Sequence, residues 1–392
     1  MRIVFKPLTA ALLAIGFGST AVHGQSMPSF KLSGFGTLAA THSGEENADY
    51  VTSITQPDGA GMTRSWAVGP DSKLGLQGDV TFTDKLSGVL QVVSKHQYDD
   101  TYKPLVEWVN VKYQVTPDFA LRAGRIALPF FMYSDNRLVN YTQPWVRPPI
   151  EAYMVNPNTS NDGVDVMYRA KLGGTTHNLQ AFYGVNNVKT PGGGNAKGHP
   201  NWGINDSMSL GDLTLRASYT YSKVDIPGFQ PLTDLAAMDG LRYPSVDLDF
   251  RTIALGALYD PGQWFATGEY IDFRGESFAQ GVRAWYVSGG YRFGSVAPYV
   301  TYASTRNHTK TEAGTGFATS IVNSVIGNPN GQDTTSLGVR WDFMRNLALK
   351  AQYDRIKLGT GSTGRLSVPF GSTLPPPDRK VDVFTLSVDF VF

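Results

Sequence analysis

Charged side chains with a regular spacing are the residues of this chain that could act on a solute. In several segments apolar and polar residues alternate, and a lysine or arginine occupies a polar position, so it would share one face of a β-strand with hydroxyl and amide groups. Such bases could attract or repel charged solutes in water. On this pattern, the candidate residues of a polar wall are Lys31, Lys73, Arg169, Lys171, Arg340 and Lys350.

A second set of charges lies in the longest segment without alternation, residues 126–162. Its charged candidates are Asp135, Arg137, Arg147 and Glu151. The segment also contains five prolines, which stiffen its backbone, and six aromatic residues, which need a surface to pack against. We therefore expect an ordered loop that brings its charges close to the polar wall.

Catalytic and metal-binding patterns are absent from the sequence. The histidines after position 24 are far apart and lack the spacing of a zinc site, and no Gly-x-Ser-x-Gly motif occurs. Residues 359–364 match the dinucleotide fingerprint formally, but a proline-rich stretch follows them instead of a helix. We predict no catalytic residues, no metal and no cofactor.

The N-terminus predicts export from the cytoplasm. Arg2 and Lys6 precede an apolar stretch over residues 8–17, and small and polar residues continue to Gly24, as in a secretory signal peptide. We predict a signal peptide over residues 1–24. Removing its two bases leaves 32 basic residues against 33 acidic ones, a balance that argues against a nucleic-acid partner. The chain has no cysteine, so it has no disulfide framework.

Alternating segments and turn residues organise the rest of the chain into one repeated pattern. Seven short turns rich in Gly, Asp, Asn or Pro alternate strictly with eight longer connections, which leaves sixteen predicted strands. A membrane barrel has this layout, with short turns on one side and longer loops on the other. We predict an all-β fold, a sixteen-stranded antiparallel transmembrane β-barrel that occupies residues 25–392.

The terminal strand favours a closed barrel over an open sheet. Apolar residues occupy every second position from Phe384 to Phe392 at the chain end. A closed barrel has no free edge, so this strand can pair with the first one, residues 30–41. A soluble β-sandwich with one wet face is the alternative, but its strands are usually shorter and its connections would not fall into two classes.

Two predicted strands alternate poorly. Within residues 105–113, Glu107, Asn110 and Lys112 cannot all face one side, and Arg122 and Arg125 lie on opposite faces of the next strand. Both strands flank the longest loop. A contact between subunits or a misplaced strand boundary would explain the irregularity.

Short motifs in the order of the strands resemble the Gram-negative outer-membrane porins, the trimeric sixteen-stranded diffusion channels. Residues 72–78 (Ser-Lys-Leu-Gly-Leu-Gln-Gly) are similar to the family's Ser-Arg-Leu-Gly-Phe-Lys-Gly pattern. Residues 123–125 (Ala-Gly-Arg) resemble the end of the fifth strand, and residues 286–293 resemble part of a late hairpin. Phe392 resembles the terminal aromatic residue of the family. Together these motifs cover the whole mature chain.

The resemblance implies a water-filled pore that the third loop, residues 126–162, narrows by folding inward. It also implies that Lys73 belongs to the basic wall, with a lysine in place of the family's arginine. The family's acidic Pro-Glu-Phe-Gly-Gly stretch is absent, and residues 148–153 (Pro-Pro-Ile-Glu-Ala-Tyr) stand there instead. The acidic filter residues of the family therefore have no direct equivalent in this chain.

These features predict a homotrimeric outer-membrane porin, with membrane lipid and small hydrophilic solutes as its partners. The first hypothesis is passive diffusion, and the second is a porin selective for one solute class, carboxylates or sugars. An outer-membrane enzyme and an adhesin are weaker alternatives, because catalytic groups and very large loops are lacking. Nine bases against six acids at inward positions predict near neutrality or a weak anion preference.

Overall fold

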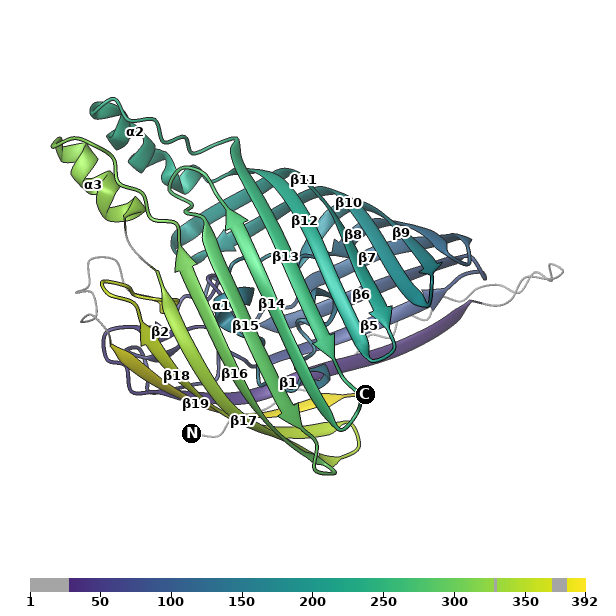
Figure 1. Ribbon diagram of the computed structural model, residues 1–392. Coiled ribbons are helices and arrows are strands. Elements are labelled where there is room, and N and C mark those ends of the chain that lie inside the picture. Colours follow the sequence, from purple (N-terminus) through teal and green to yellow (C-terminus); the bar gives the residue numbers. More distant parts are fainter. Residues whose placement is uncertain (1–27, 328–329, 369–378) are drawn as a thin grey trace, which may run out of the picture.

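The structure is a computed structural model that describes residues 28–327, 330–368 and 379–392. The predicted signal peptide, residues 1–24, lies outside these ranges. Sixteen long antiparallel strands form a closed β-barrel (Figure 1), which confirms the predicted fold class. None of the helices in the described ranges is long and apolar enough to cross a membrane.

The strands follow one another around the barrel in chain order. They are β1 (Ser29–Ser43), β5 (Lys73–Thr81), β6 (Leu86–Lys95), β7 (Leu105–Thr116), β8 (Phe119–Ala127), β9 (Ser160–Leu172), β10 (Thr175–Thr190), β11 (Gly194–Leu210), β12 (Leu213–Asp225), β13 (Leu248–Tyr259), β14 (Trp264–Arg274), β15 (Val282–Tyr291), β16 (Val296–Asn307), β17 (Gln332–Met344), β18 (Leu347–Leu358) and β19 (Lys380–Val391). Strand β1 pairs with both β5 and β19, so no long strand is left with a free edge.

The closing seam depends on two glycines of β1. Gly34 and Phe392 exchange two backbone hydrogen bonds of 3.0 Å, and Gly36 lies opposite Phe390. Each phenylalanine ring covers the glycine across from it, and a Cβ atom added to Gly34 would lie 2.3 Å from the ring of Phe392. The chain end is therefore the last piece of the barrel wall, as its alternation predicts.

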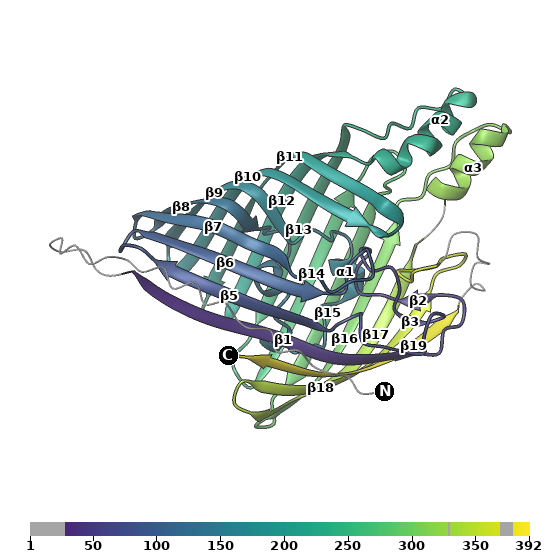
Figure 2. The ribbon, with the colours of Figure 1, turned by 180° about the vertical axis from the view of Figure 1, so that it is seen from behind.

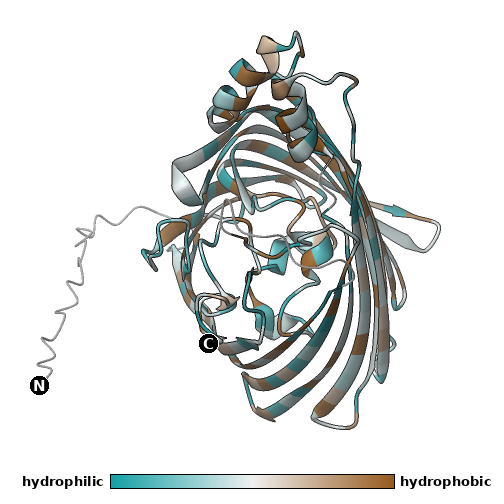
Figure 3. Ribbon diagram, turned by 90° about the vertical axis from the view of Figure 1, so that its left-hand side faces the viewer, coloured by the Kyte–Doolittle hydropathy of each residue, from teal (hydrophilic) through white to brown (hydrophobic). Residues whose placement is uncertain are grey.

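Large apolar side chains cover the outer face of the strands, while polar and small residues point inward. Along β5, for example, Leu74 and Leu76 are exposed outward, and Lys73 lies on the inner face. Figure 3 shows this alternation as bands of opposite hydropathy around the barrel. Phe293 and Phe343 are exposed next to the short turns, where aromatic residues suit a membrane interface.

The two strands that alternate poorly contain local irregularities. The register of β7 against β6 shifts between the pairs Gln91–Trp108 and Val92–Val106, and this leaves Glu107 as the extra residue of a β-bulge. In β8, Gly124 has a φ of 124° and separates the inward Arg122 from Arg125. Both strands are longer than predicted, and the bulge explains why Glu107 departs from the alternation.

Most of the longer connections lie at the barrel end opposite the short turns. The first contains the short strands β2 (Asp49–Tyr50), β3 (Ala60–Gly61) and β4 (Trp66–Ala67). Two later ones carry helices α2 (Gln230–Met238) and α3 (Phe317–Ile326), which pack together beside the barrel mouth (Figures 1 and 2). Short 3₁₀ turns η3 (Pro191–Gly193) and η4 (Pro227–Phe229) complete this end.

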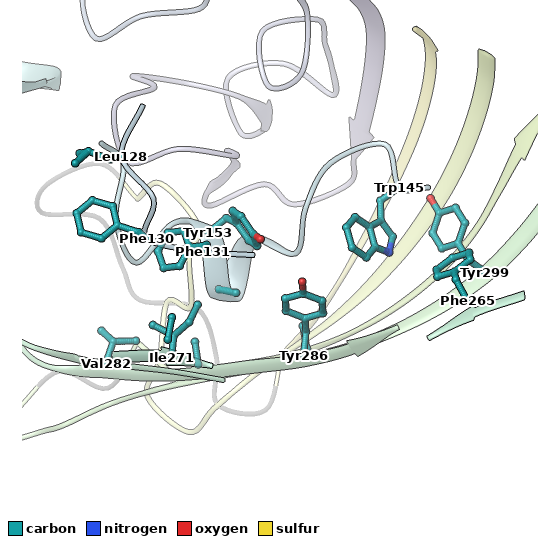
Figure 4. Packing of buried hydrophobic residues seen from close by; sticks show 14 of the residues in the cluster. Leu128, Phe130, Phe131, Trp145, Tyr153, Phe265, Ile271, Val282, Tyr286 and Tyr299 are labelled. Atoms are coloured by element: carbon teal, nitrogen blue, oxygen red, sulfur yellow. The ribbon is translucent and has the colours of Figure 1, made fainter. Parts of the chain in front are cut away.

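The connection between β8 and β9 does not stay at the mouth but enters the barrel. It contains two 3₁₀ turns, η1 (Ser134–Asn136) and η2 (Asn140–Thr142), and a short helix α1 (Ile150–Tyr153). Its aromatic residues pack on the inner faces of strands β10 and β13 to β16 and form the main buried cluster (Figure 4). Trp145, for example, is almost fully buried and donates to the hydroxyls of Ser288 and Thr301.

Candidate functional site

Lys350 binds the inward loop from the part of the wall where the last strands close the barrel. This lysine points inward from β18 and is completely buried. Its Nζ donates to three backbone carbonyls of the loop, those of Asn140, Gln143 and Trp145, at 2.7, 2.8 and 2.7 Å. The same Nζ lies 2.8 Å from a carboxylate oxygen of Asp389 on β19. An ammonium group has three protons, so the loop carbonyls use its full donor capacity.

Arg340 and Lys73 continue this support on either side of Lys350. Arg340 donates to the carbonyls of Tyr141 and Gln143 at 2.6 and 2.9 Å, and its guanidinium lies 4.9 Å from the centre of the Tyr141 ring. Lys73 donates to the side-chain oxygen of Asn140 at 3.1 Å. These wall bases therefore bind oxygen atoms of the loop, and Arg340 also forms an ion pair of 2.7 Å with Asp342 of its own strand.

The loop also binds the rest of the barrel through a charged side chain of its own, that of Arg147. Its guanidinium is buried, forms two 2.7 Å hydrogen bonds with Asp71, and donates to Asp354 at 3.0 Å and to the Tyr50 hydroxyl at 2.8 Å. Burial opposes the charge on Arg147, but Asp71 and the other partners outweigh it and raise its pKa above the ordinary value. We call Lys73, Arg340, Lys350 and Arg147 the anchor cluster.

Glu151 is also turned toward the wall. It is almost fully buried on α1 and accepts hydrogen bonds from Gln332 and Thr334 of β17. Burial raises the pKa of Glu151, and these two hydrogen bonds partly oppose the shift. Neither Arg147 nor Glu151 therefore presents a free charge to a passing solute.

The two remaining loop candidates lie around η1. The side chain of Asp135 is 67% exposed, and one of its oxygens lies 3.3 Å from Nη1 of Arg216 on β12. Arg137 folds back on the loop, where it donates to the carbonyls of Tyr153 and Asn156. Burial lowers the pKa of Arg137 to about 10. Asp135 is thus the loop candidate that faces solvent.

Lys31, Arg169 and Lys171 are exposed and lie away from the anchor cluster. Arg169 lines a cavity of about 230 Å³ with Lys112 and Arg216, and two acids, Asp118 and Asp135, also line it. Among the residues that the structure describes, Lys112 and Arg169 form no ion pair within 4.0 Å. This cavity, which we call the basic cavity, gathers unpaired positive charge on the wall opposite the anchors.

The candidate set from the sequence lacks Asp71 and Asp354, the two acids that hold Arg147. Asp354 alternates with apolar residues of β18, so its inward direction is visible in the sequence. Asp71 lies in the connection before β5, where no periodicity gives its direction. Its pairing with a residue 76 positions away became visible only in the fold.

One group of possible metal ligands occurs within the described ranges, formed by Asp58, His96 and Asp100 in two connections at the barrel mouth. Asp58 already pairs with Arg64 at 3.1 Å, and His96 contacts Asp100 at 2.8 Å. The second ring nitrogen of His96 is buried and has no hydrogen-bond partner in the part of the chain that the structure describes, whereas metal-binding histidines usually donate from that atom. The group therefore fits a loop contact better than a metal site.

Comparison with known proteins places this architecture in a family. The family model described as "Gram-negative porin" matches residues 9–361. The chain belongs to the Gram-negative porin family. It is therefore a multi-pass β-barrel of the outer membrane, and the family and fold are those of diffusion channels, not of enzymes. No curated protein sequence matches the chain.

Solved porin structures share the fold at low sequence identity. The anion-selective porin from Comamonas acidovorans is 14% identical, with a TM-score of 0.58 over 93% of this chain and 100% of its own. The outer membrane channel DcaP of Acinetobacter baumannii is 15% identical, with a TM-score of 0.60 over 96% and 99%. OmpT of Vibrio cholerae, in a trimer form, is 13% identical, with a TM-score of 0.55 over 94% and 100%.

Proposed function

We propose that this porin lets small hydrophilic solutes and ions diffuse passively and favours anions weakly. The observation that carries the preference is the basic cavity, where Lys112 and Arg169 have no acidic partner among the described residues. Within the described residues, Arg216 pairs with one carboxylate, that of the exposed Asp135. Positive charge on one side of a narrow passage lowers the free energy of an anion there and raises that of a cation.

The anchor cluster supports the proposed role of residues 126–162 as the constriction loop. Its contacts hold the loop against strands β5, β17 and β18. The basic cavity lies along the wall from β7 to β12, and we place the passage there. Because the anchoring bases already bind loop oxygens, they contribute little free charge to the passage. Selectivity would then depend on the charged residues that line the basic cavity, Lys112, Arg169, Arg216, Asp118 and Asp135.

Reversal potentials in a potassium chloride gradient across a planar lipid bilayer test this proposal. The wild-type channel should favour chloride weakly, and Lys112→Gln combined with Arg169→Gln should move the potential toward cation selectivity. Lys103→Gln, which removes a base from the exposed loop between β6 and β7, is the matched control and should leave the potential unchanged. A strongly cation-selective wild-type channel would refute the proposed preference.

A homotrimer is the proposed assembly. On the outer face near the loop end of β8 and β9, Arg125 and Asp162 form an ion pair of 2.6 Å. A charge pair is costly against lipid but suits a contact with another protein subunit. The trimer form of Vibrio cholerae OmpT has a similar fold. The mass of the native protein in detergent, corrected for bound detergent, should equal three chains, and a monomeric mass would contradict the proposal.

Selectivity for one solute class is the second candidate function. The basic cavity favours a carboxylate over a sugar, because three bases outnumber the two acids, Asp118 and Asp135, in its lining and its volume of about 230 Å³ can hold a small carboxylate. Conductance that saturates with rising concentration of one carboxylate, but not of chloride, would favour this function over general diffusion.

A further inference from the structure

A second cavity in the barrel interior differs in chemistry from the rest of the channel. It has a volume of about 420 Å³ and lies between the inward loop and the loop-side halves of β12, β13 and β14. None of the described residues that line it carries a charge. Its apolar lining includes Phe130, Val155, Val224, Phe229, Phe250 and Phe273. We call it the aromatic cavity.

Its phenylalanines have the geometry of a binding surface. Phe250 of β13 and Phe273 of β14 meet edge to face at 5.2 Å, and both are only half-buried although they point into the barrel. Phe229 of η4 lines the cavity from the loop end. Apolar surface that remains exposed to water inside a channel gains free energy when an apolar group covers it. These rings therefore favour a solute with an apolar face.

Neutral amides supply the polar part of the cavity. Asn201 of β11 lines it and is 1% exposed, and its side-chain oxygen has no hydrogen-bond partner among the described residues. The side-chain oxygen of Asn195 is likewise buried without a partner. A buried acceptor without a donor is unfavourable, so a hydroxyl group on a solute would stabilise this site. With no charged lining residue, the cavity offers no counterion to a charged solute.

The position of the cavity decides which kind of occupant can reach it. Thr220, Ser222 and Thr252, which line it, point inward from β12 and β13, and the inward loop forms its other side. The barrel wall separates it from membrane lipid, and another protein chain would have to enter the lumen. Solutes in the channel meet it on the loop side of the constriction.

We propose that the aromatic cavity is a binding site for small neutral solutes that combine an aromatic or aliphatic ring with hydroxyl groups. Such a ring packs on Phe250 and Phe273, while a hydroxyl donates to a free asparagine oxygen. A pocket that is mostly apolar with a few polar groups is the usual form of a small-molecule site. This site goes beyond the proposed anion preference, because it uses none of the bases of the basic cavity.

Single-channel recordings with two neutral glycosides test the proposal. Phenyl β-D-glucopyranoside carries an aromatic ring, and methyl β-D-glucopyranoside has the same sugar without it. In chloride solution the phenyl glycoside should reduce the wild-type current in a saturable way, at a concentration at least tenfold lower than the methyl glycoside requires. Phe250→Ser combined with Phe273→Ser should bring the two concentrations to within about threefold of each other.

Phe293→Ser is the matched control, because it removes an exposed phenylalanine at a short turn, far from the cavity lining. It should retain the tenfold difference. Equal effects of the two glycosides on the wild type, or an unchanged difference in the double variant, would overturn the proposal. If the double variant does not assemble, Phe229→Ser on the η4 turn provides the same comparison without changing a strand. The reversal potential of the wild type separately reports whether the proposed anion preference holds.

Discussion

Replacing Arg147 with methionine should destabilise the barrel and free the inward loop from the wall. Methionine keeps much of the side-chain volume but removes the charge and the four hydrogen bonds to Asp71, Asp354 and Tyr50. Both carboxylates would stay buried, because Asp71 and Asp354 are each 2% exposed. Breaking a buried ion pair by removing one partner costs about 3–5 kcal/mol. We expect a loss of that size in the free energy of unfolding.

Two measurements check this expectation. Urea unfolding of the refolded protein in lipid vesicles gives the change in stability, and single-channel recording shows whether the passage widens. The freed loop should give a higher and noisier conductance, because the other three anchors hold it only around η2. Arg292→Met is the matched control, since Arg292 and Asp260 form a comparable pair whose side chains are 37% and 35% exposed. An exposed pair should cost no more than about 1 kcal/mol.

A third variant separates lost charge pairing from lost packing. In Arg147→Met combined with Asp71→Asn and Asp354→Asn, no carboxylate is left without a partner, so a large part of the stability should return. If Arg147→Met behaves like Arg292→Met in both measurements, the anchor role of Arg147 is wrong. If the triple variant is no more stable than Arg147→Met, packing and not charge holds this part of the loop.

Three further outcomes follow from the structure. Lys350→Met removes the lysine donor from three loop carbonyls and should produce frequent current fluctuations, whereas a variant trace as steady as that of the wild type would contradict the anchoring. Gly34→Val places a side chain in the ring of Phe392 and should lower the heat-dissociation temperature seen on gels, while Gly44→Val, in open space, should not. Burial raises the pKa of Glu151, so the Glu151 carboxyl holds its proton more tightly in the folded barrel than in the unfolded chain. Protonation of Glu151 therefore favours folding at acidic pH, and this contribution to stability is lost as the pH rises through the folded pKa. Glu151→Gln should therefore flatten the pH dependence of urea unfolding between mildly acidic and neutral pH, and an unchanged profile would refute this reading.

The alternation of apolar and polar residues was enough to predict the strands, the turns and the closed barrel. A strand has a period of two, and lipid outside with water inside imposes one face on each side, so local sequence carries the information. It also gave the inward direction of Lys350 and Arg340. The irregularity around Glu107 had a local cause as well, although only the register of β7 against β6 showed that it is a bulge.

The tertiary structure alone decided what the inward residues contact. Lys350 binds backbone carbonyls about 200 positions away in the chain, and Arg147 contacts Asp71 of the connection before β5 and Asp354 of β18. No periodicity predicts such contacts, because a proline-rich loop has no fixed repeat and its path depends on which surface accepts its aromatic residues. The sequence therefore determined the barrel and which charges face inward. The packing of the loop decided which of those charges hold it in place and which remain free to meet a solute.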